Sequence, residues 1–194
     1  MIAARPISTK LLLVRHGQDV DNSRSIINGR RDTPLTDLGR SQAQRVADDL
    51  RLTDIRCIYA SPLQRASQTA SILSQRLGIE DVRLEPDLIE RDYGILTGRP
   101  LSDIPALARQ VFVSHGFRYV VHAPGAEDYA YLWTRAGSVL RKIQEQRGGQ
   151  TVLIVAHNEI LRMIRAHFNR RSWEAELLFP PIANCQLIPL DIQP

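Results

Sequence analysis

Lysine and cysteine are both scarce in this chain of 194 residues. Lys10 and Lys142 are the only lysines, so arginine supplies almost all of the 25 basic residues and of the formal net charge of +4. The planar arginine fork fits pairs of phosphate oxygens, so this bias suits a phosphate-binding protein, although a GC-rich genome produces it equally well. The two cysteines, Cys57 and Cys185, lie in apolar runs expected to form strands and are too few for a secreted disulfide framework.

The chain also lacks the usual features of secreted, membrane and nucleic-acid-binding proteins. Residues 1–10 hold no apolar run of the kind found in a leader, and no apolar stretch approaches the ~20 residues that span a bilayer. Aromatic residues make up 6% of the chain, and the arginine pairs at 30–31 and 170–171 are isolated, which disfavours a nucleic-acid surface. We therefore expect a cytoplasmic protein with no membrane or nucleic-acid partner.

Apolar runs and helical patterns alternate along the sequence. Strands are expected near 11–14, 55–60 and 151–156, with a late edge strand at 186–190. Helices are expected at 37–51 with Thr36 as its cap, from Ser61-Pro62 to about 77, from 129 to about 147, and after 157. This alternation predicts one α/β domain over residues 1–194, with a mainly parallel central sheet and helices on both faces. Residues 85–128, with four prolines and weak periodicity, are expected to form an irregular excursion that covers the active-site mouth.

Polar residues of one chemical kind follow the three main predicted strands. The first strand ends in Arg15-His16-Gly17, the second leads into a helix with Arg65 in its first turn, and the third ends in His157-Asn158. If these strands are neighbours, their ends meet at one edge of the sheet, beside a helix N-terminus that favours anions. Two arginines and two histidines without an acidic cluster predict a phosphate site there, not a metal site.

On six blocks of sequence the chain resembles the histidine phosphatase superfamily, which includes the cofactor-dependent phosphoglycerate mutases. The blocks, in the family's order, are LLLVRHGQDVDN (11–22), GRRDTPLTDLG (29–39), IYASPLQRASQTA (58–70), LIERDYGILTG (88–98), PGAE (124–127) and VLIVAHNEILR (152–162). The resemblance covers nearly the whole chain. It implies the phosphoglycerate mutase-like form of the α/β fold.

The resemblance also implies five catalytic residues. His16 would attack phosphorus and become a phosphohistidine, and Glu90 would act as general acid and base. The phosphoryl oxygens would be held by Arg15, Arg65 and His157. Fixed arginines can stabilise the charge that develops in phosphoryl transfer, so no metal and no cofactor are expected.

The resemblance also implies five substrate-binding positions, and the pattern of the family is altered around them. These positions are Asn22, Gly29, Arg91, Tyr93 and Asn158. Asp19 stands where threonine or serine is usual, and since a carboxylate would repel phosphate, we expect Asp19 to point away or to pair with an arginine. Leu101 takes the place of a substrate-binding lysine, and Gly116-Phe117 takes the place of an arginine pair, for which Arg118 could substitute.

Loss of these cations favours a phosphatase that hydrolyses small anionic phosphate esters. Two alternatives stay open, a phosphoglycerate mutase, which the ERDYG block at 90–94 resembles, and a catalytically weak member that binds phosphorylated ligands or a partner protein. A metallohydrolase is disfavoured because His115 and His122 are seven residues apart and no HxH or HxxxH pairing occurs. The expected partner is a small phosphorylated metabolite, and the sequence does not predict an oligomeric state.

Overall fold

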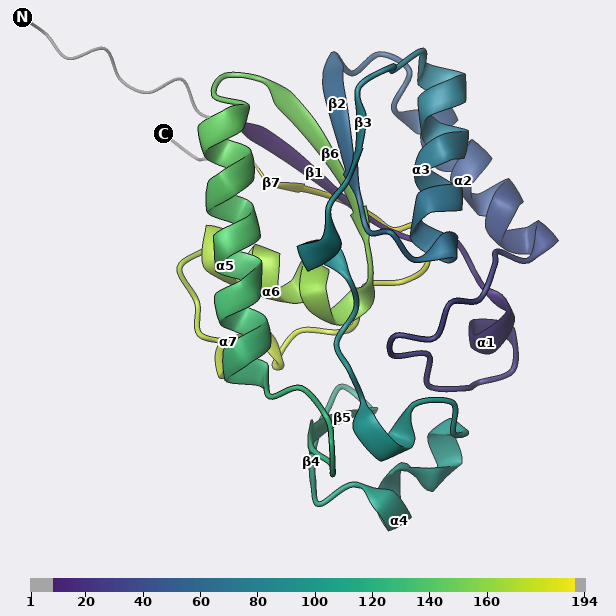
Figure 1. The fold of residues 1–194 in the computed structure, drawn as a ribbon, viewed down its shortest axis with the longest axis vertical. Coiled ribbons are helices and arrows are strands. Elements are labelled where there is room, and N and C mark those ends of the chain that lie inside the picture. Colours follow the sequence, from purple (N-terminus) through teal and green to yellow (C-terminus); the bar gives the residue numbers. More distant parts are fainter. Residues whose placement is uncertain (1–8, 191–194) are drawn as a thin grey trace, which may run out of the picture.

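The computed structural model describes residues 9–190 and is built around a five-stranded sheet (Figure 1). Its strands are β1 (Lys10–Arg15), β2 (Ile55–Ala60), β3 (Val82–Leu84), β6 (Thr151–Ala156) and β7 (Leu187–Leu190). They lie in the order β3-β2-β6-β1-β7, with β7 antiparallel to β1 and the other pairs parallel. The predicted parallel sheet and late edge strand are confirmed, while the leader prediction for residues 1–10 falls mostly outside the described range.

Helices cover both faces of this sheet. The helices of residues 9–190 are α1 (Val20–Ser23), α2 (Asp37–Asp49), α3 (Gln64–Leu77), α4 (Ile104–Leu107), α5 (Tyr129–Gln146), α6 (Asn158–Phe168) and α7 (Trp173–Glu176). Helices α2 and α3 lie on one face, and α5 and α6 lie on the other (Figure 1). Among residues 9–190, no helix combines the length and apolar character needed to cross a bilayer.

Strand β1 shows why its sequence is a continuous apolar run. Successive side chains of a strand point to opposite faces, so a strand covered on both sides alternates between two cores. Leu11 and Leu13 pack into the core beneath α5 and α6, whereas Leu12 and Val14 pack into the core beneath α2 and α3. All four side chains are buried.

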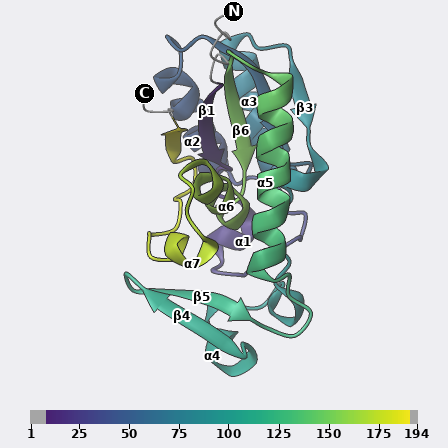
Figure 2. The ribbon, with the colours of Figure 1, turned by 90° about the vertical axis from the view of Figure 1, so that its left-hand side faces the viewer.

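The excursion at 85–128 has more regular structure than predicted. It contains 3₁₀ turns at Pro86–Leu88, Gly94–Leu96 and Leu101–Asp103, helix α4, and the antiparallel hairpin of β4 (Gln110–Ser114) and β5 (Phe117–His122). Figure 2 shows the hairpin crossing the end of the molecule beyond α5 and α7. The sequence pattern is weak because the hairpin's register shifts between Gln110 and Val111 and most of its residues are not fully buried.

Two local predictions were wrong in detail. Helix α3 begins at Gln64, with Leu63 at the cap position and no side-chain cap there, so Ser61 lies before the helix; its hydroxyl accepts the Leu63 N–H at 3.4 Å and is 2.7 Å from His157 Nε2. Cys185 precedes β7 in a left-handed conformation with φ of 56° instead of lying in the strand. The predicted cap of α2 is confirmed, since Thr36 Oγ1 accepts the Gly39 N–H at 3.1 Å.

Candidate active site

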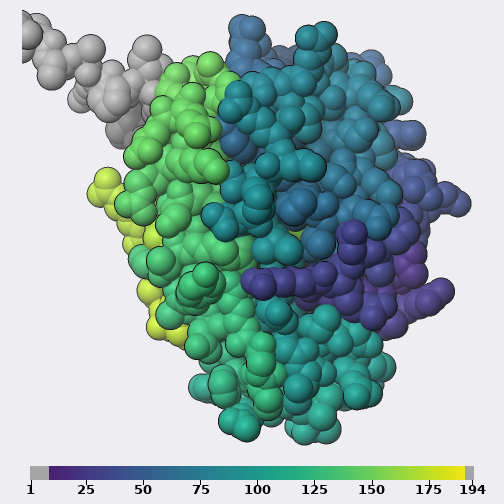
Figure 3. Space-filling view, viewed as in Figure 1, coloured from purple at the N-terminus to yellow at the C-terminus, as the bar shows by residue number. Residues whose placement is uncertain are grey.

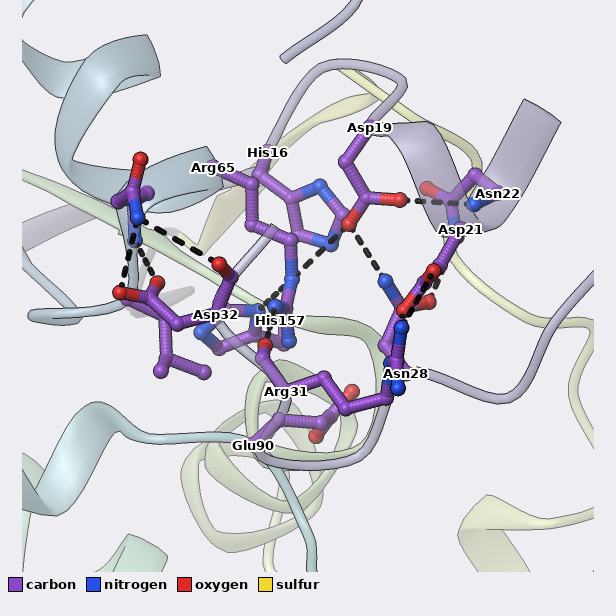
Figure 4. Close-up of polar contacts among 12 residues, drawn as sticks. His16, Asp19, Asp21, Asn22, Asn28, Arg31, Asp32, Arg65, Glu90 and His157 are labelled. Atoms are coloured by element: carbon purple, nitrogen blue, oxygen red, sulfur yellow. Dashed lines mark hydrogen bonds and ion pairs between the residues drawn. The ribbon is translucent and has the colours of Figure 1, made fainter. Parts of the chain in front are cut away.

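The ends of β1, β2 and β6 meet at one edge of the sheet. Because β6 lies between β1 and β2 and all three are parallel, the residues that follow them are brought together. His16 and His157, which follow β1 and β6, are both buried, and their ring centroids are 5.1 Å apart. Figure 4 shows Arg65, from the first turn of α3, between these rings and the loop after β1.

The hydrogen bonds of His16 define which ring nitrogen is available for attack. Nδ1 lies 2.7 Å from the Gly17 carbonyl oxygen, which can only accept, so Nδ1 carries the proton. The lone pair is then on Nε2. Burial, followed by the charges of Arg15 and Arg65, holds the pKa of His16 well below its usual range, so the ring is neutral and nucleophilic.

His157 is also neutral, but its two nitrogens are engaged by protein groups. Arg65 Nε donates to Nδ1 at 3.2 Å, so the proton is on Nε2, which is 2.7 Å from Ser61 Oγ. Burial and the charge of Arg65 lower the pKa of His157 well below its usual range. The ring lies beside His16 but is not among the described residues that line the cavity, so its predicted contact with phosphate requires Nε2 to leave Ser61.

Two arginines, Arg65, which is buried, and Arg15, which is partly buried, supply unused donors to the same place. Arg65 Nη1 donates to the Arg31 carbonyl oxygen at 2.6 Å and Nη2 to the Gly29 carbonyl oxygen at 2.9 Å, which leaves one N–H on each terminal nitrogen. Arg15 Nη1 donates to the Ile182 carbonyl oxygen at 2.7 Å, and its buried Nε has no partner within the described residues. Both side chains line the cavity. An anion there would satisfy donors that the fold leaves unpaired.

Glu90 lies at the N-terminus of α6 and is buried. Its Oε1 accepts the N–H groups of Arg91 at 2.9 Å and Ile160 at 3.3 Å, and its Oε2 accepts the N–H of Glu159 at 3.3 Å. Burial, with a second contribution from the charge of Glu159, raises the pKa of Glu90. The alternative of a surface carboxylate paired with Arg91 is wrong, because Glu90 is buried and the Arg91 guanidinium is directed elsewhere.

A cavity of about 330 Å³ joins these groups. Arg15, His16, Arg65 and Glu90 line one end of it, which we call the catalytic end after the roles predicted for these residues. The excursion supplies the wall formed by Leu101, Ile104, Arg118, Tyr119 and Val120. In Figure 3 the purple loop after β1 lies against the teal excursion, to which Ser25 and Ile27 are joined by backbone hydrogen bonds. The cavity therefore lies where these two segments meet the end of the sheet.

Four of the five predicted substrate-binding residues line this cavity, namely Asn22, Gly29, Tyr93 and Asn158. The amide groups of the two asparagines are already engaged by protein. Asn22 Nδ2 donates to Asn28 Oδ1 at 3.0 Å, and Asn158 Oδ1 accepts the Ile182 N–H at 2.8 Å. These hydrogen bonds fix the side chains at the wall before any ligand arrives.

The fifth predicted substrate-binding residue, Arg91, does not line the cavity. Its guanidinium is fully buried, and its three nitrogens donate to the carbonyl oxygens of Glu127, Val120 and Val121. The guanidinium carbon also lies 4.0 Å from the centroid of the Tyr129 ring. Arg91 therefore links parts of the excursion to one another and packs on α5, and in this arrangement it does not face the cavity.

Two further residues lie beside the site. The sequence analysis did not name Asn184, and it left the orientation of Asp19 open. Asn184, just before β7, lines the cavity and donates to both the His16 carbonyl oxygen and Asn22 Oδ1 at 3.0 Å. No sequence motif marked Asn184, because this residue comes close to the site only when β7 pairs antiparallel with β1. Asp19 does pair with an arginine, since its Oδ2 lies 3.2 Å from Arg65 Nε.

Metal-ligating side chains do not cluster at this site. Within residues 9–190, no group of three or more His, Cys, Asp or Glu side chains is placed to hold a metal ion. The positive charge that faces the catalytic end of the cavity comes from Arg15 and Arg65.

Comparison with known proteins matches this chain to one family along almost its full length. The model of the histidine phosphatase superfamily (branch 1) matches residues 11–194. Phosphoglycerate mutase-like protein 4 of Arabidopsis thaliana is 34% identical over 160 residues, which cover 80% of this chain and 69% of the relative. Probable phosphoglycerate mutase GpmB of Yersinia enterocolitica is 31% identical over 189 residues, which cover 95% of this chain and 85% of the relative.

A solved structure matches the fold as well. The mycobacterial glucosyl-3-phosphoglycerate phosphatase superposes with a TM-score of 0.79 at 23% identity, over 94% of this chain and 89% of the other. This similarity supports the phosphoglycerate mutase-like arrangement of sheet and helices and, at this identity, the fold alone.

Proposed function

Because this chain belongs to the histidine phosphatase superfamily, we propose that it is a phosphatase that hydrolyses small anionic phosphate esters through a phosphohistidine at His16. One observation carries the proposal. The ring of His16 is neutral and buried, its proton is held on Nδ1, and it faces a cavity into which Arg15 and Arg65 present unpaired N–H groups. Such a site combines a nucleophile with the charge stabilisation that phosphoryl transfer requires.

In the first step, His16 Nε2 attacks phosphorus, the N–P bond forms and the ester P–O bond breaks. The departing alkoxide takes a proton from Glu90, whose raised pKa keeps that proton available. Arg15 and Arg65 stabilise the charge on the phosphoryl oxygens, and the fork geometry of each guanidinium suits this task.

In the second step, water replaces the alcohol. The Glu90 carboxylate removes a proton from water as the water oxygen attacks phosphorus, and the N–P bond breaks to restore neutral His16. Phosphate is released, and Glu90 again carries the proton needed for the next ester. One carboxyl group thus serves as acid in the first half of the cycle and as base in the second.

The cavity wall supports a phosphatase over a mutase. The wall formed by the excursion carries one charged side chain, Arg118, which makes no hydrogen bond or ion pair within the described residues. Leu101, at the position of the substrate-binding lysine, also lines the wall. One cation holds a second phosphate group weakly, so the phosphoryl group should be lost to water before it is returned to an organic acceptor.

A mutase is the second candidate. Two relatives are named as a phosphoglycerate mutase-like protein and a probable phosphoglycerate mutase, and both are more than 30% identical to this chain. The structural neighbour named as a glucosyl-3-phosphoglycerate phosphatase represents the hydrolytic alternative. The proposal further includes a single catalytic domain over residues 1–194 and a cytoplasmic location.

Trapping the phosphoenzyme tests the proposal. We expect acid-quenched turnover of a phosphomonoester to leave an acid-labile, base-stable phosphate on the wild-type protein, and none on His16→Ala. His167→Ala is a matched control, because this histidine lies on α6, outside the cavity, with its Nε2 2.7 Å from the Trp133 carbonyl oxygen. Full activity of His16→Ala would overturn the mechanism, and the absence of turnover in the wild type would favour a binding protein.

A further inference from the structure

Asp19 is a buried carboxylate next to the phosphoryl site. It immediately precedes α1, has no exposed surface and accepts the N–H of Asn22 at 2.7 Å as the cap of that helix. Its other oxygen accepts Asn28 Nδ2 at 2.6 Å and lies 3.2 Å from Arg65 Nε (Figure 4). Asp19 does not line the cavity, so any influence on a ligand must pass through the arginine.

The contact with Asp19 restricts how Arg65 can turn. Arg65 Nε donates its N–H to His157 Nδ1 and lies 3.2 Å from Asp19 Oδ2 in an ion pair, while each terminal nitrogen gives one N–H to a backbone carbonyl. Every nitrogen of the guanidinium is therefore engaged, and two N–H groups remain, one on each terminal nitrogen. These two donors are available to a ligand, and the carboxylate lies against the Nε side of the guanidinium.

The same contact reduces the positive charge that a phosphate ion meets. Arg15 and Arg65 are the cations at the catalytic end of the cavity, and Asp19 places a full negative charge against one of them. Neither side chain of the Asp19–Arg65 pair is exposed, so solvent and salt screen this charge poorly. A phosphate dianion in the cavity is therefore attracted by Arg65 and repelled by the carboxylate behind it.

We propose that Asp19 is a positioning residue that holds the Arg65 guanidinium at the phosphoryl site and also keeps the affinity of the site for free phosphate low. The inference rests on the proposed function, because it concerns the ion that hydrolysis leaves behind. A hydrolase must release phosphate in every cycle, and a site that held the dianion with two uncompensated arginines would be inhibited by its product. Asp19 thus favours release over retention.

Titration calorimetry with inorganic phosphate and with orthovanadate tests this role. We expect Asp19→Asn to bind both anions about tenfold more tightly than the wild type, because one buried negative charge is removed close to the ligand. Asp21→Asn is the matched control, since Asp21 is a buried carboxylate of α1 that is paired with Arg31, outside the cavity, at 2.7 Å. The control should change neither affinity by more than about twofold.

The kinetic signature is equally specific. In Asp19→Asn, inhibition by phosphate should strengthen in parallel with the calorimetric affinity, and kcat should fall more than kcat/KM as product release slows. A residue that only supports folding would weaken both binding and turnover. If Asp19→Asn does not fold, Asp19→Thr offers the same test, because threonine also caps helices and carries no charge.

Two different failures can be told apart. If the wild type binds both anions but neither uncharged variant binds them more tightly, the role of Asp19 is overturned and the proposed function stands. If the wild type binds neither phosphate nor vanadate, the phosphoryl site itself is wrong, and the proposed function fails with it.

Discussion

At the scale of single residues, the protein environment shifts the pKa values of His16 and Glu90, the two ionisable groups of the proposed reaction, in opposite directions. Burial and two arginines lower the pKa of His16 and keep its ring neutral, while burial and Glu159 raise the pKa of Glu90 and help it to retain a proton. A neutral base beside a protonated acid is the combination that the first chemical step needs. Burial favours the uncharged form of both groups, because removing either from water disfavours its charged form.

Replacing Glu90 tests whether it donates that proton. An alkyl alkoxide leaves poorly unless it is protonated, whereas p-nitrophenolate is already a stable anion. Since general acid catalysis is typically worth about a hundred- to ten-thousand-fold, Glu90→Gln should slow phosphorylation of His16 by an alkyl phosphate by about a hundredfold or more, and by p-nitrophenyl phosphate far less. Rapid-quench burst rates with both substrates measure this step separately from dephosphorylation.

Glu176→Gln provides the control for this experiment. Glu176 is likewise a buried carboxylate whose pKa is raised by burial, but it pairs with Arg165 outside the cavity. It should change the two burst rates by the same factor. Equal losses for both substrates in Glu90→Gln would show that Glu90 supports the N-terminus of α6 instead of donating a proton.

At the scale of elements, a contact between two glycines sets the loop after β1 against the start of α2. A Cβ on Gly17 would lie 2.4 Å from the Gly39 carbonyl oxygen, and a Cβ on Gly39 would lie 2.1 Å from the Gln18 carbonyl oxygen. Neither glycine has a positive φ. Both positions therefore require glycine because two backbones approach closely, and this approach holds the loop that carries His16.

Gly39→Ala should be destabilising, although alanine is the better helix former by about 1 kcal/mol. The obstacle is a backbone carbonyl that cannot rotate away, so we expect the free energy of unfolding to fall by about 2 kcal/mol, measured by urea denaturation. Gly148→Ala is the control, because its nearest contact is 4.0 Å away, and its stability should stay within about 0.5 kcal/mol. A stable Gly39→Ala protein would mean that the loop and α2 move apart freely.

At the scale of the whole molecule, the strand ends bring Arg15, His16 and Arg65 together, and the excursion supplies Glu90 and the wall that the phosphoryl acceptor would meet in the proposed reaction. Arg91 donates to carbonyl oxygens of the excursion some thirty residues away in the sequence, and its guanidinium packs on the Tyr129 ring of α5. Hydrolysis or transfer should therefore depend on the wall's charge.

Competition between acceptors tests this view. We expect the wild-type phosphoenzyme to transfer its phosphoryl group to water faster than to 3-phosphoglycerate. Leu101→Lys should raise the ratio of transfer to hydrolysis several-fold, because it adds a cation to the wall, and half of the Leu101 surface is exposed, so the change is tolerated. Leu52→Lys, at a fully exposed leucine outside the cavity, should leave the ratio unchanged. Faster transfer than hydrolysis in the wild type would establish the mutase.

The sequence by itself determined the features that depend on local periodicity and on strand ends. Buried apolar runs predicted the parallel sheet, helical periodicity predicted the helices on both faces, and the polar residues after three strands predicted one site. These inferences succeed because parallel neighbours must place their carboxyl ends together. His16 and Arg65 therefore meet although they come from widely separated segments, whereas Glu90, which the resemblance assigned to the site, reaches it from the excursion.

Only the tertiary structure decided how the buried polar groups are partnered. Arg91 was expected at the substrate but is satisfied by carbonyls of the excursion, His157 turns Nε2 toward Ser61, and Asp19 pairs with Arg65. The hairpin at 110–122 and the approach of Asn184 were also outside the reach of the sequence. A buried charge or amide takes whichever partner the folded backbone brings within hydrogen-bonding distance, and such partners have no fixed spacing along the chain.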